Sequence, residues 1–341
     1  MGAVSDSQDD PEGSRGPEPN GSSSPASGDD PLDGLTIRAL VGPTAVGKTA
    51  LALRVAAAAD CEIVSLDSML VYRGLDIGTA KPSAAERQAA PHHLIDVVGP
   101  QERYDVQRYL KDVRNVLREL RTRDKRALFV GGTGFYLAAL LRGLFEGPPI
   151  DAALRSSIEE RVRVEGGELL HAELKGYDPE AAARIHPNDT KRLVRAIEVR
   201  EQTGRTLSEW QREWGWHDGK APAERPSRIV GLELERDALD VRIRERTRRM
   251  LDAGWADEAA RIRDTAGLSS TAIQALGYTQ ALALADGELD RASCEEEIAL
   301  RTRQFARRQR TWFKKFPSIT WLSAELNEKT LLARAMEGLG W

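Results

Sequence analysis

The stretch GPTAVGKT, Gly42 to Thr49, decides the fold of this chain. It matches the phosphate-loop pattern G-x-x-x-x-G-K-[ST] at every fixed position. The apolar run Ile37–Val41 before it predicts a strand, and the Ala/Leu-rich residues 49–59 after it predict a helix. Such a turn aims backbone N–H groups and a helix N-terminus at one anion. We therefore expect the loop to hold a di- or triphosphate, rather than to be a strand–helix turn that binds nothing.

All eight residues of the loop are predicted diphosphate contacts: Gly42, Pro43, Thr44, Ala45, Val46, Gly47, Lys48 and Thr49. Lys48 adds a mobile positive charge and is also a catalytic candidate. The Thr49 hydroxyl suits a Mg²⁺ ion that bridges to the phosphates, so Mg²⁺ is the predicted cofactor and Thr49 its predicted ligand.

Two further cations, Arg242 and Arg246, are separated by one helical turn. They could grip the diphosphate together or form ion pairs with the neighbouring Asp240 and Glu245. We assign Arg242 to the catalytic set and Arg246 to the diphosphate contacts.

The composition is that of an ordinary globular protein. A chain of 341 residues exceeds the size at which one core stops growing, so two domains are expected. Apolar residues make up 41% and charged residues 30%, and no apolar run approaches the ~20 residues of a membrane span. The N-terminus lacks the pattern of a signal peptide, and Cys61 and Cys294 are far apart. We expect a cytoplasmic protein without a membrane partner, acting as a monomer.

Residues 1–34 differ from the rest of the chain. They are rich in Ser, Gly, Pro and Asp, and carry eight acidic residues against Arg15, a charge of −7. Because the whole chain has a net charge of −4, the remaining residues carry +3. Too few apolar residues are present to offset the entropy of ordering, so residues 1–34 are predicted to be a disordered acidic tail.

Strand and helix signals alternate between residues 37 and 144. Further strands are predicted at 62–66, 94–98 and 127–130, and helices at 104–123 and 136–144. This alternation predicts an α/β fold of the P-loop NTPase-like class, a parallel sheet flanked by helices. Ligands of such sheets bind at the carboxyl ends of the strands, where Asp67 and Thr133 both fall.

The pattern changes at Gly147-Pro148-Pro149. Residues 148–225 are predicted to form an inserted all-helical domain, with helices at 151–166, 167–176, 179–185 and 189–203. Residues 229–234 alternate like a strand that returns to the sheet, and the chain is mainly helical from 237 onward. Residues 35–147 and 226–341 therefore form the predicted P-loop core with its C-terminal helices.

Asp67 and Thr133 each have two readings. Asp67 is either a helix N-cap for the residues from Ser68 onward or a carboxylate that acts as general base. Thr133, between glycines, either contacts a leaving oxygen or caps the next helix. The strand at 127–130 ends in Gly-Gly-Thr, without the acid that hydrolytic P-loop proteins use for Mg²⁺. This weakens an ATPase or motor interpretation.

His92, His93 and Asp96 resemble a metal cluster at first sight. Neighbouring side chains of an extended segment point to opposite sides, and no third ligand has suitable spacing. We favour a structural role for both histidines.

A basic segment with aromatic residues lies late in the chain. Residues 301–315 hold no acid, interleave Phe305, Trp312 and Phe313, and carry seven cations: Arg301, Arg303, Arg307, Arg308, Arg310, Lys314 and Lys315. A solvated helix normally mixes both signs, whereas this pattern suits a nucleic-acid backbone and unstacked bases. A second basic group is Lys191, Arg192 and Arg195.

With these residues in view, the sequence resembles the bacterial tRNA dimethylallyltransferase family over residues 37–322. The resemblance lies in seven segments in order: GPTAVGKT (42–49), SLDSMLVYRGLDIGTAKP (65–82), PHHLIDVV (91–98), GGTGFYLAALLRGL (131–144), IHPNDTKRLVRAIEV (185–199), LGYTQAL (276–282) and RTRQFARRQRTWF (301–313).

The resemblance implies transfer of the prenyl group of dimethylallyl diphosphate to N6 of the adenine 3′ of a tRNA anticodon. It implies that Asp67 is the general base and that Thr133 contacts the diphosphate side, both as catalytic residues. It also implies that residues 148–225 bind tRNA, and that the tRNA contacts are Asp67, Ser68, Met69, Leu70, Thr133, Arg155, Lys191, Arg192, Leu193, Val194, Arg195, Gln274, Gly277, Tyr278, Arg307, Arg308, Gln309, Trp312 and Lys314.

The chemistry agrees with the residues. An allylic diphosphate leaves readily when cations and N–H groups neutralise its charge, and a stacked adenine must be flipped out to react. Three other readings stay open: an isopentenyltransferase for free adenine nucleotides, a P-loop kinase of a small nucleotide, and a non-enzymatic RNA-binding protein. The first two do not need the basic helix, and the third does not need Lys48 and Thr49.

Overall fold

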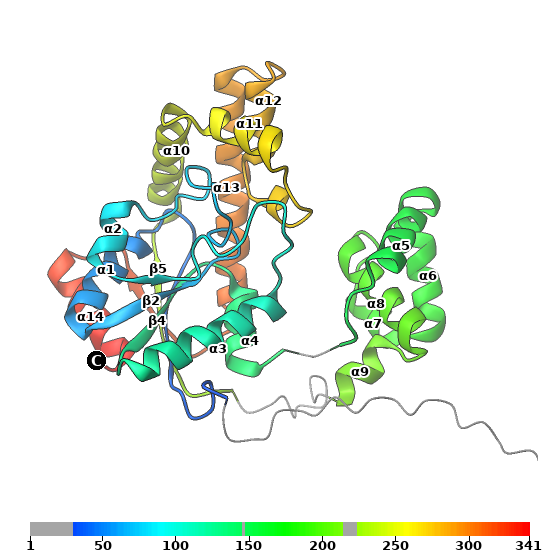
Figure 1. Ribbon diagram of the computed structural model, residues 1–341, viewed down its shortest axis with the longest axis horizontal. Helices are drawn as coiled ribbons and strands as arrows, with labels where there is room; N and C mark the ends of the chain where they lie inside the picture. The colour runs from blue at the N-terminus through cyan, green and yellow to red at the C-terminus, as the bar shows by residue number, and fades with distance from the viewer. Residues whose placement is uncertain (1–29, 145–146, 214–223) are drawn as a thin grey trace, which may run out of the picture.

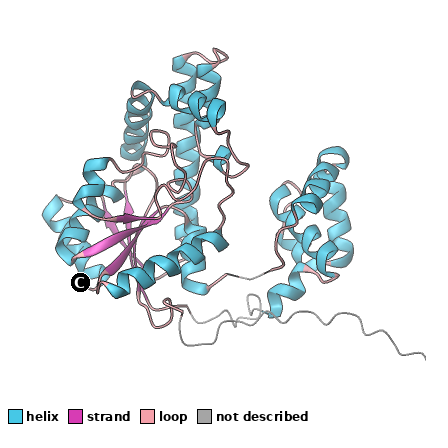
Figure 2. Cartoon of the chain, viewed as in Figure 1, coloured by secondary structure: helices cyan, strands magenta, loops and turns pink. Residues whose placement is uncertain are grey.

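The computed structural model describes residues 30–144, 147–213 and 224–341, and most of the predicted acidic tail lies outside this part. In the described part, a six-stranded sheet has the order β3-β2-β4-β1-β5-β6. Figure 2 shows its strands in magenta, with the helices in cyan. All its ladders are parallel. This confirms the predicted α/β class. The strands are β1 Ile37–Val41, β2 Cys61–Leu66, β3 His92–His93, β4 Arg126–Gly131, β5 Ser227–Glu233 and β6 Ile319–Ser323.

Helices flank the sheet and extend beyond it (Figure 1). Their bounds are α1 Lys48–Ala59, α2 Ala84–Ala89, α3 Val106–Thr122, α4 Gly134–Arg142, α5 Ala152–Glu165, α6 Gly167–Tyr177, α7 Pro179–Arg184, α8 Thr190–Thr203, α9 Leu207–Glu213, α10 Arg236–Asp252, α11 Trp255–Thr265, the 3₁₀ turn η1 Ala272–Gln274, α12 Tyr278–Ala285, α13 Arg291–Phe313 and α14 Glu328–Leu339.

Alternation along each strand builds two cores, one on each face of the sheet. On β1, Ile37, Ala39 and Val41 join the core shared with α3 and α4, whereas Leu40 joins the core shared with α1 and α14. Successive strand residues point to opposite faces, so a strand covered on both sides is apolar throughout. The sheet is therefore buried, and only its edges at the strand ends remain for a ligand.

A separate core belongs to the helices between residues 152 and 213. It contains Ile158, Leu170, Leu174, Ile197 and the other buried apolar side chains of α5 to α8. Leu193 and Val194 belong to this core, with 0% and 2% of their surfaces exposed. The resemblance assigned both residues to tRNA contacts, but their side chains face the inside of this helical unit. The domain boundaries themselves stay predictions.

Several local predictions differ from the structure. Residues 94–98 are not a strand: Leu94 and Asp96 have φ values of 61° and 58°, and the neighbouring β3 has only two residues. The short elements α2, α9 and β6 are not among the predicted elements, because five to seven residues carry little periodic signal. The structure also begins before residue 35, since Leu32 is 1% exposed in the core and Asp30 pairs with Arg114 at 3.0 Å.

The helical core yields a test of the Leu193 reassignment. Leu193→Ala should lower the free energy of unfolding by about 2–5 kcal/mol, because it removes buried methyl groups and leaves a cavity. Arg192→Ala, one residue away, should change it by no more than about 0.5 kcal/mol, because Arg192 forms only a surface ion pair with Asp189. Urea denaturation of both variants measures this difference, and equal effects would contradict the burial of Leu193.

Candidate functional site

A cavity of about 570 Å³ opens at the carboxyl ends of the central strands. The phosphate loop contributes Thr44, Lys48 and Thr49 at one end, and α13 contributes Phe305 and Arg308. Between them lie the strand-end residues Asp67 and Thr133, Arg246 of α10, and apolar side chains that include Met69, Leu70, Met250 and Ile273. The cavity thus joins the phosphate loop to the basic helix.

The Lys48 ammonium group is folded onto its own loop. Its Nζ donates to the carbonyl oxygens of Gly42 and Pro43 at 3.0 and 2.8 Å. Burial lowers the pKa of Lys48 to about 8, and Arg246 adds to the decrease whereas Asp67 opposes it. An anion bound in the loop would favour the charged ammonium, so this lysine is poised for a phosphate.

Arg242 and Arg246 play different parts. Arg242 Nη1 donates to the carbonyl oxygen of Val46 at 3.0 Å, so it braces the loop from outside the cavity lining. Arg246 lines the cavity, and burial lowers its pKa while the Asp67 charge opposes that decrease. It has no hydrogen bond or ion pair to any described residue. Asp240 pairs with Arg244 and Arg303, so neither predicted pairing is formed.

Asp67 is the only acidic residue that lines the cavity within the described part of the chain. Its Oδ1 accepts from the Met69 backbone N–H at 2.8 Å. No helix begins at Ser68, since the next one starts at Ala84, so the N-cap reading is wrong in that form. One N–H bond leaves the second carboxylate oxygen without a described partner, available for a proton.

Thr133 joins the ends of β2 and β4. It occupies the N-cap position of α4, yet its hydroxyl caps no helical N–H. Instead Oγ1 accepts from the Ser68 N–H at 3.2 Å, and the Thr133 N–H donates to the Leu66 carbonyl at 3.1 Å. Thr133 therefore holds the backbone next to Asp67, and a diphosphate contact for it stays a prediction.

Gln309 of α13 reaches back into the core of the site. Its Oε1 accepts from the Thr44 N–H at 2.9 Å, and its Nε2 donates to the Gly132 carbonyl at 2.9 Å. The residue is 4% exposed. Its amide is thus occupied by protein partners that tie the phosphate loop to the end of β4. A tRNA contact is expected to have an exposed side chain, whereas the Gln309 side chain is buried.

The predicted tRNA contacts of the helical unit form two groups. Arg155 and Arg195 donate to the fully buried Glu198 at 2.6 and 2.9 Å, so both guanidinium groups neutralise a buried carboxylate. Lys191 donates to Gln274 Oε1 at 2.6 Å, and this bond links the helical unit to Gln274, which is another predicted tRNA contact. Arg192 remains 70% exposed.

The basic segment of α13 leaves most of its charge unpaired. Arg303 pairs with Asp240 and Glu296. The other six cations form no ion pair with the described residues: Arg301, Arg307, Arg308, Arg310, Lys314 and Lys315. Lys315 lies 4.5 Å from the centroid of Trp312, and Arg308 lies 5.8 Å from that of Phe305. These stacked cations and rings offer phosphate and base contacts together.

Two other predicted contacts differ in their position relative to the cavity. Gly277 lines the cavity, whereas Tyr278 is fully buried and its hydroxyl donates to Glu258 at 2.7 Å. The structure gives Tyr278 a supporting position behind the cavity wall.

The histidine pair and Asp96 make separate contacts. His93 Nε2 bonds to Glu62 at 2.6 Å, which also accepts from Arg123, while Asp96 binds Lys81 and Arg87. Among the described residues, no group of three or more His, Cys, Asp or Glu could hold a metal ion. A Mg²⁺ ion here would therefore depend on phosphate oxygens, which is its usual mode, and the exposed Thr49 hydroxyl beside Lys48 fits that arrangement.

A phosphate loop at the edge of a parallel sheet, with cations around one carboxylate, defines a P-loop protein that binds a phosphorylated ligand. The IPP transferase family profile matches residues 70–316, and the isopentenyl transferase profile matches residues 35–96. The chain belongs to the IPP transferase family. None of its described helices has the length and apolarity that crossing a bilayer requires.

Relatives and solved structures agree with this family. A tRNA dimethylallyltransferase of Methylococcus capsulatus is 47% identical over 285 residues, 83% of this chain and 90% of the relative. One of Geobacter sulfurreducens is 41% identical over 88% of this chain and 95% of its own. The tRNA isopentenylpyrophosphate transferase structure of Bacillus halodurans has a TM-score of 0.64 at 33% identity, covering 89% of this chain and 97% of that one. A eukaryotic dimethylallyltransferase acting on tRNA has a TM-score of 0.73 at 26% identity, covering 88% and 77%.

Some cavity residues were not assigned to the site from the sequence. Arg301 and Phe305, predicted only as part of the basic segment, line the cavity and lie one helical turn apart. Trp255 also lines the cavity, but no local pattern marks it.

The Gln309 bridge can be tested by its effect on stability. Gln309→Ala should lower the free energy of unfolding by about 1–3 kcal/mol, because the Thr44 N–H and the Gly132 carbonyl lose their partner. Gln304→Ala is the matched control, an exposed glutamine on the same helix. Chemical denaturation compares the two, and an unchanged stability of Gln309→Ala would show that water replaces the bridge.

Proposed function

We propose that this protein transfers the dimethylallyl group of dimethylallyl diphosphate to the exocyclic N6 of the adenine that follows the anticodon in a subset of tRNAs. The observation that carries the proposal is that one cavity joins the phosphate loop, Asp67 and two cations of the basic segment, Arg301 and Arg308. The printed names of the relatives and of the eukaryotic structure point to the same reaction.

The phosphate-loop end suits the donor. Loop N–H groups, Lys48 and Arg246 surround the place of a diphosphate, and apolar residues such as Met250 and Ile273 continue from it toward the prenyl chain. These cations stabilise the negative charge that develops on the diphosphate as its bond to C1 of the prenyl group breaks. We propose Thr49 as the protein ligand of a Mg²⁺ ion, which when bound neutralises further phosphate charge.

Asp67 suits the acceptor. As N6 forms its bond to C1, the amine must lose one proton. Asp67 is a carboxylate that lines the cavity, and its second oxygen is free to accept that proton. Thr133 bonds the backbone of Leu66 and Ser68 on either side of Asp67, and the Met69 N–H donates to the carboxylate itself. The strand β4 ends in glycine, so no second carboxylate is present at its end to activate a water molecule.

The basic helix favours a polynucleotide acceptor over a free nucleotide. Six unpaired cations exceed what one small molecule can contact, and several lie outside the cavity. A kinase or an isopentenyltransferase for free nucleotides would leave them without a ligand. Because one chain supplies both ends of the cavity, we propose the monomer as the active unit.

The proposal is tested by a transfer assay. Labelled dimethylallyl diphosphate and Mg²⁺ should label bulk tRNA and leave AMP unlabelled. Asp67→Asn should lower the transfer rate by about 10²–10⁴-fold, because the amide cannot accept the proton. It retains an oxygen that can accept from Met69, so the melting temperature should change little. Labelled AMP with unlabelled tRNA, or rapid ATP turnover, would instead support the small-molecule readings.

A second experiment separates tRNA binding from chemistry. Arg307 and Lys314 are exposed and lie outside the cavity, so changing both to Ala should weaken tRNA binding and reduce its salt dependence by about 0.9 per lost phosphate contact. Donor affinity should stay unchanged. Arg291→Ala is the control, since Arg291 begins the same helix but pairs with Asp252. An unchanged salt slope in the double variant would make this face an ordinary solvated surface.

A further inference from the structure

Two stretches far apart in the sequence form facing parts of the cavity lining. We call them the first wall, residues 67–82, and the second wall, residues 273–280; half of the first wall and most of the second line the cavity. The first wall also carries Asp67. Both walls contact the first turn of α11, which itself supplies only Trp255 to the lining.

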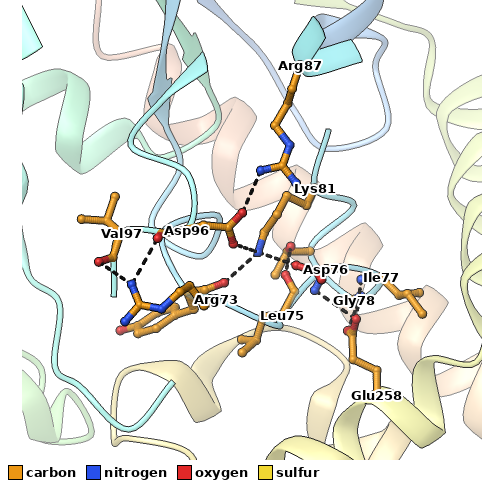
Figure 3. Close-up of polar contacts among 12 residues, drawn as sticks. Arg73, Leu75, Asp76, Ile77, Gly78, Lys81, Arg87, Asp96, Val97 and Glu258 are labelled. Atoms are coloured by element: carbon orange, nitrogen blue, oxygen red, sulfur yellow. Dashed lines mark hydrogen bonds and ion pairs between the residues drawn. The ribbon is translucent and has the colours of Figure 1, made fainter. Parts of the chain in front are cut away.

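Glu258, one turn into α11, is bonded to both walls, and Figure 3 shows its bonds to the first wall. Its Oε2 accepts from the N–H groups of Asp76 and Ile77 at 3.0 and 2.8 Å. Its Oε1 accepts from the Gly78 N–H at 3.1 Å and from the Tyr278 hydroxyl at 2.7 Å. The residue is 4% exposed, and no cation among the described residues pairs with it. A buried carboxylate with only N–H and O–H donors depends on all of them, because each compensates for lost water.

Trp255, three residues earlier, fills the space between the same walls. A Cβ atom on Gly78 would lie 2.1 Å from the Trp255 indole nitrogen, and one on Gly277 would lie 2.2 Å from its ring. Both glycines therefore allow the backbone to approach the indole more closely than any side chain permits. The ring also meets Tyr278 edge to face at 5.8 Å. One face of α11 thus sets the spacing of the two walls.

The first wall is anchored at its other side by Lys81. Its Nζ is bonded to Asp76, to Asp96 and to the Tyr72 carbonyl oxygen at 2.6, 2.5 and 2.8 Å (Figure 3). Asp76 belongs to both anchors: its N–H binds Glu258 and its carboxylate binds Lys81. Lys81 therefore joins the first wall to Asp96, which lies in the loop after β3, and Glu258 joins the first wall to α11.

We infer that Glu258 is a positioning residue for the transfer reaction. By joining the backbone of residues 76–78 to Tyr278, it fixes the distance between the walls and so the shape of the cavity in which the acceptor base meets Asp67. Glu258 is absent from the cavity lining and does not reach substrate. The phosphate loop has no part in these bonds. The expected loss of kcat rests on the proposed function, whereas the expected loosening of the two walls does not.

The test uses Glu258→Gln and Tyr278→Phe in the full chain. The glutamine amide turns an NH₂ group toward a backbone donor, so at least one wall is released, whereas Tyr278→Phe releases only the second wall. Glu258→Gln should lower kcat for transfer to saturating tRNA by about 10–100-fold, the cost of misplacing reacting groups. Tyr278→Phe should lower it less. The affinity for inorganic diphosphate should stay unchanged in both.

Hydrogen exchange supplies the readout that does not depend on activity. Peptides covering residues 72–82 and 273–282 should both exchange faster in Glu258→Gln, although nearly 200 residues separate them. Asp178→Asn is the matched control, a carboxylate 2% exposed that accepts the N–H groups of Ala181 and Ser208 at 3.0 Å each in the helical unit. It should leave hydrogen exchange in both wall peptides unchanged.

The outcomes separate the two claims. If Glu258→Gln leaves exchange in the walls or the saturated kcat unchanged, or if Asp178→Asn speeds exchange in the walls equally, the positioning role is overturned. If the walls loosen as expected but the wild-type protein fails to modify tRNA, the structural inference stands and the proposed function fails. Should Glu258→Gln not fold, Tyr278→Phe alone decides, through exchange at residues 273–282 and kcat.

Discussion

The parallel register of three neighbouring strands is the constraint on which the site depends. Val41 of β1 pairs with Gly131 of β4, and Gly131 pairs with Leu66 of β2. The next residue of each strand, Gly42, Gly132 and Asp67, therefore leaves the sheet at the same edge. A shift of one residue in either ladder would turn side chains to the opposite face and separate the carboxylate from the phosphate loop. Gln309 and Thr133 secure this edge, since each bonds across two of the three strand ends.

The charges at this edge favour a bound anion. Lys48 and Arg246 lie close enough to Asp67 for its charge to affect the pKa of both, and Arg301 and Arg308 line the same cavity. One carboxylate cannot balance four cations in a partly dry cavity, and burial already disfavours the charge on Lys48. A diphosphate would restore that balance. The electrostatics therefore favour a phosphorylated ligand at the loop, and Asp67 lies near these cations without an ion pair to any described residue.

Much of the edge could be predicted from the sequence, because it depends on local patterns. The phosphate-loop motif predicts the geometry of the loop. Residues that follow parallel strands lie at the same edge of the sheet, and on this basis the sequence predicts that Asp67 and Thr133 lie there. Leu193 and Val194 show the limit of resemblance: a matching motif does not say which side chains of a helix face inward. Glu258 and Gln309 show the limit of local reasoning. Most of their partners lie about 180 to 265 residues away, so only the folded chain reveals them.

Three kinds of carboxylate in this protein differ by their partners rather than by their chemistry. Glu198 and Asp96 lie between two cations each, so their charge is neutralised and their role is to hold elements together. Each oxygen of Glu258 accepts two hydrogen bonds from neutral donors. These four bonds fix the carboxylate in place and leave no lone pair free for a substrate proton. Asp67 has a single N–H bond within a cavity of positive charge. Only this third arrangement combines a fixed position with an unused oxygen. A general base needs both, because it must be oriented before the proton arrives and must have somewhere to put it.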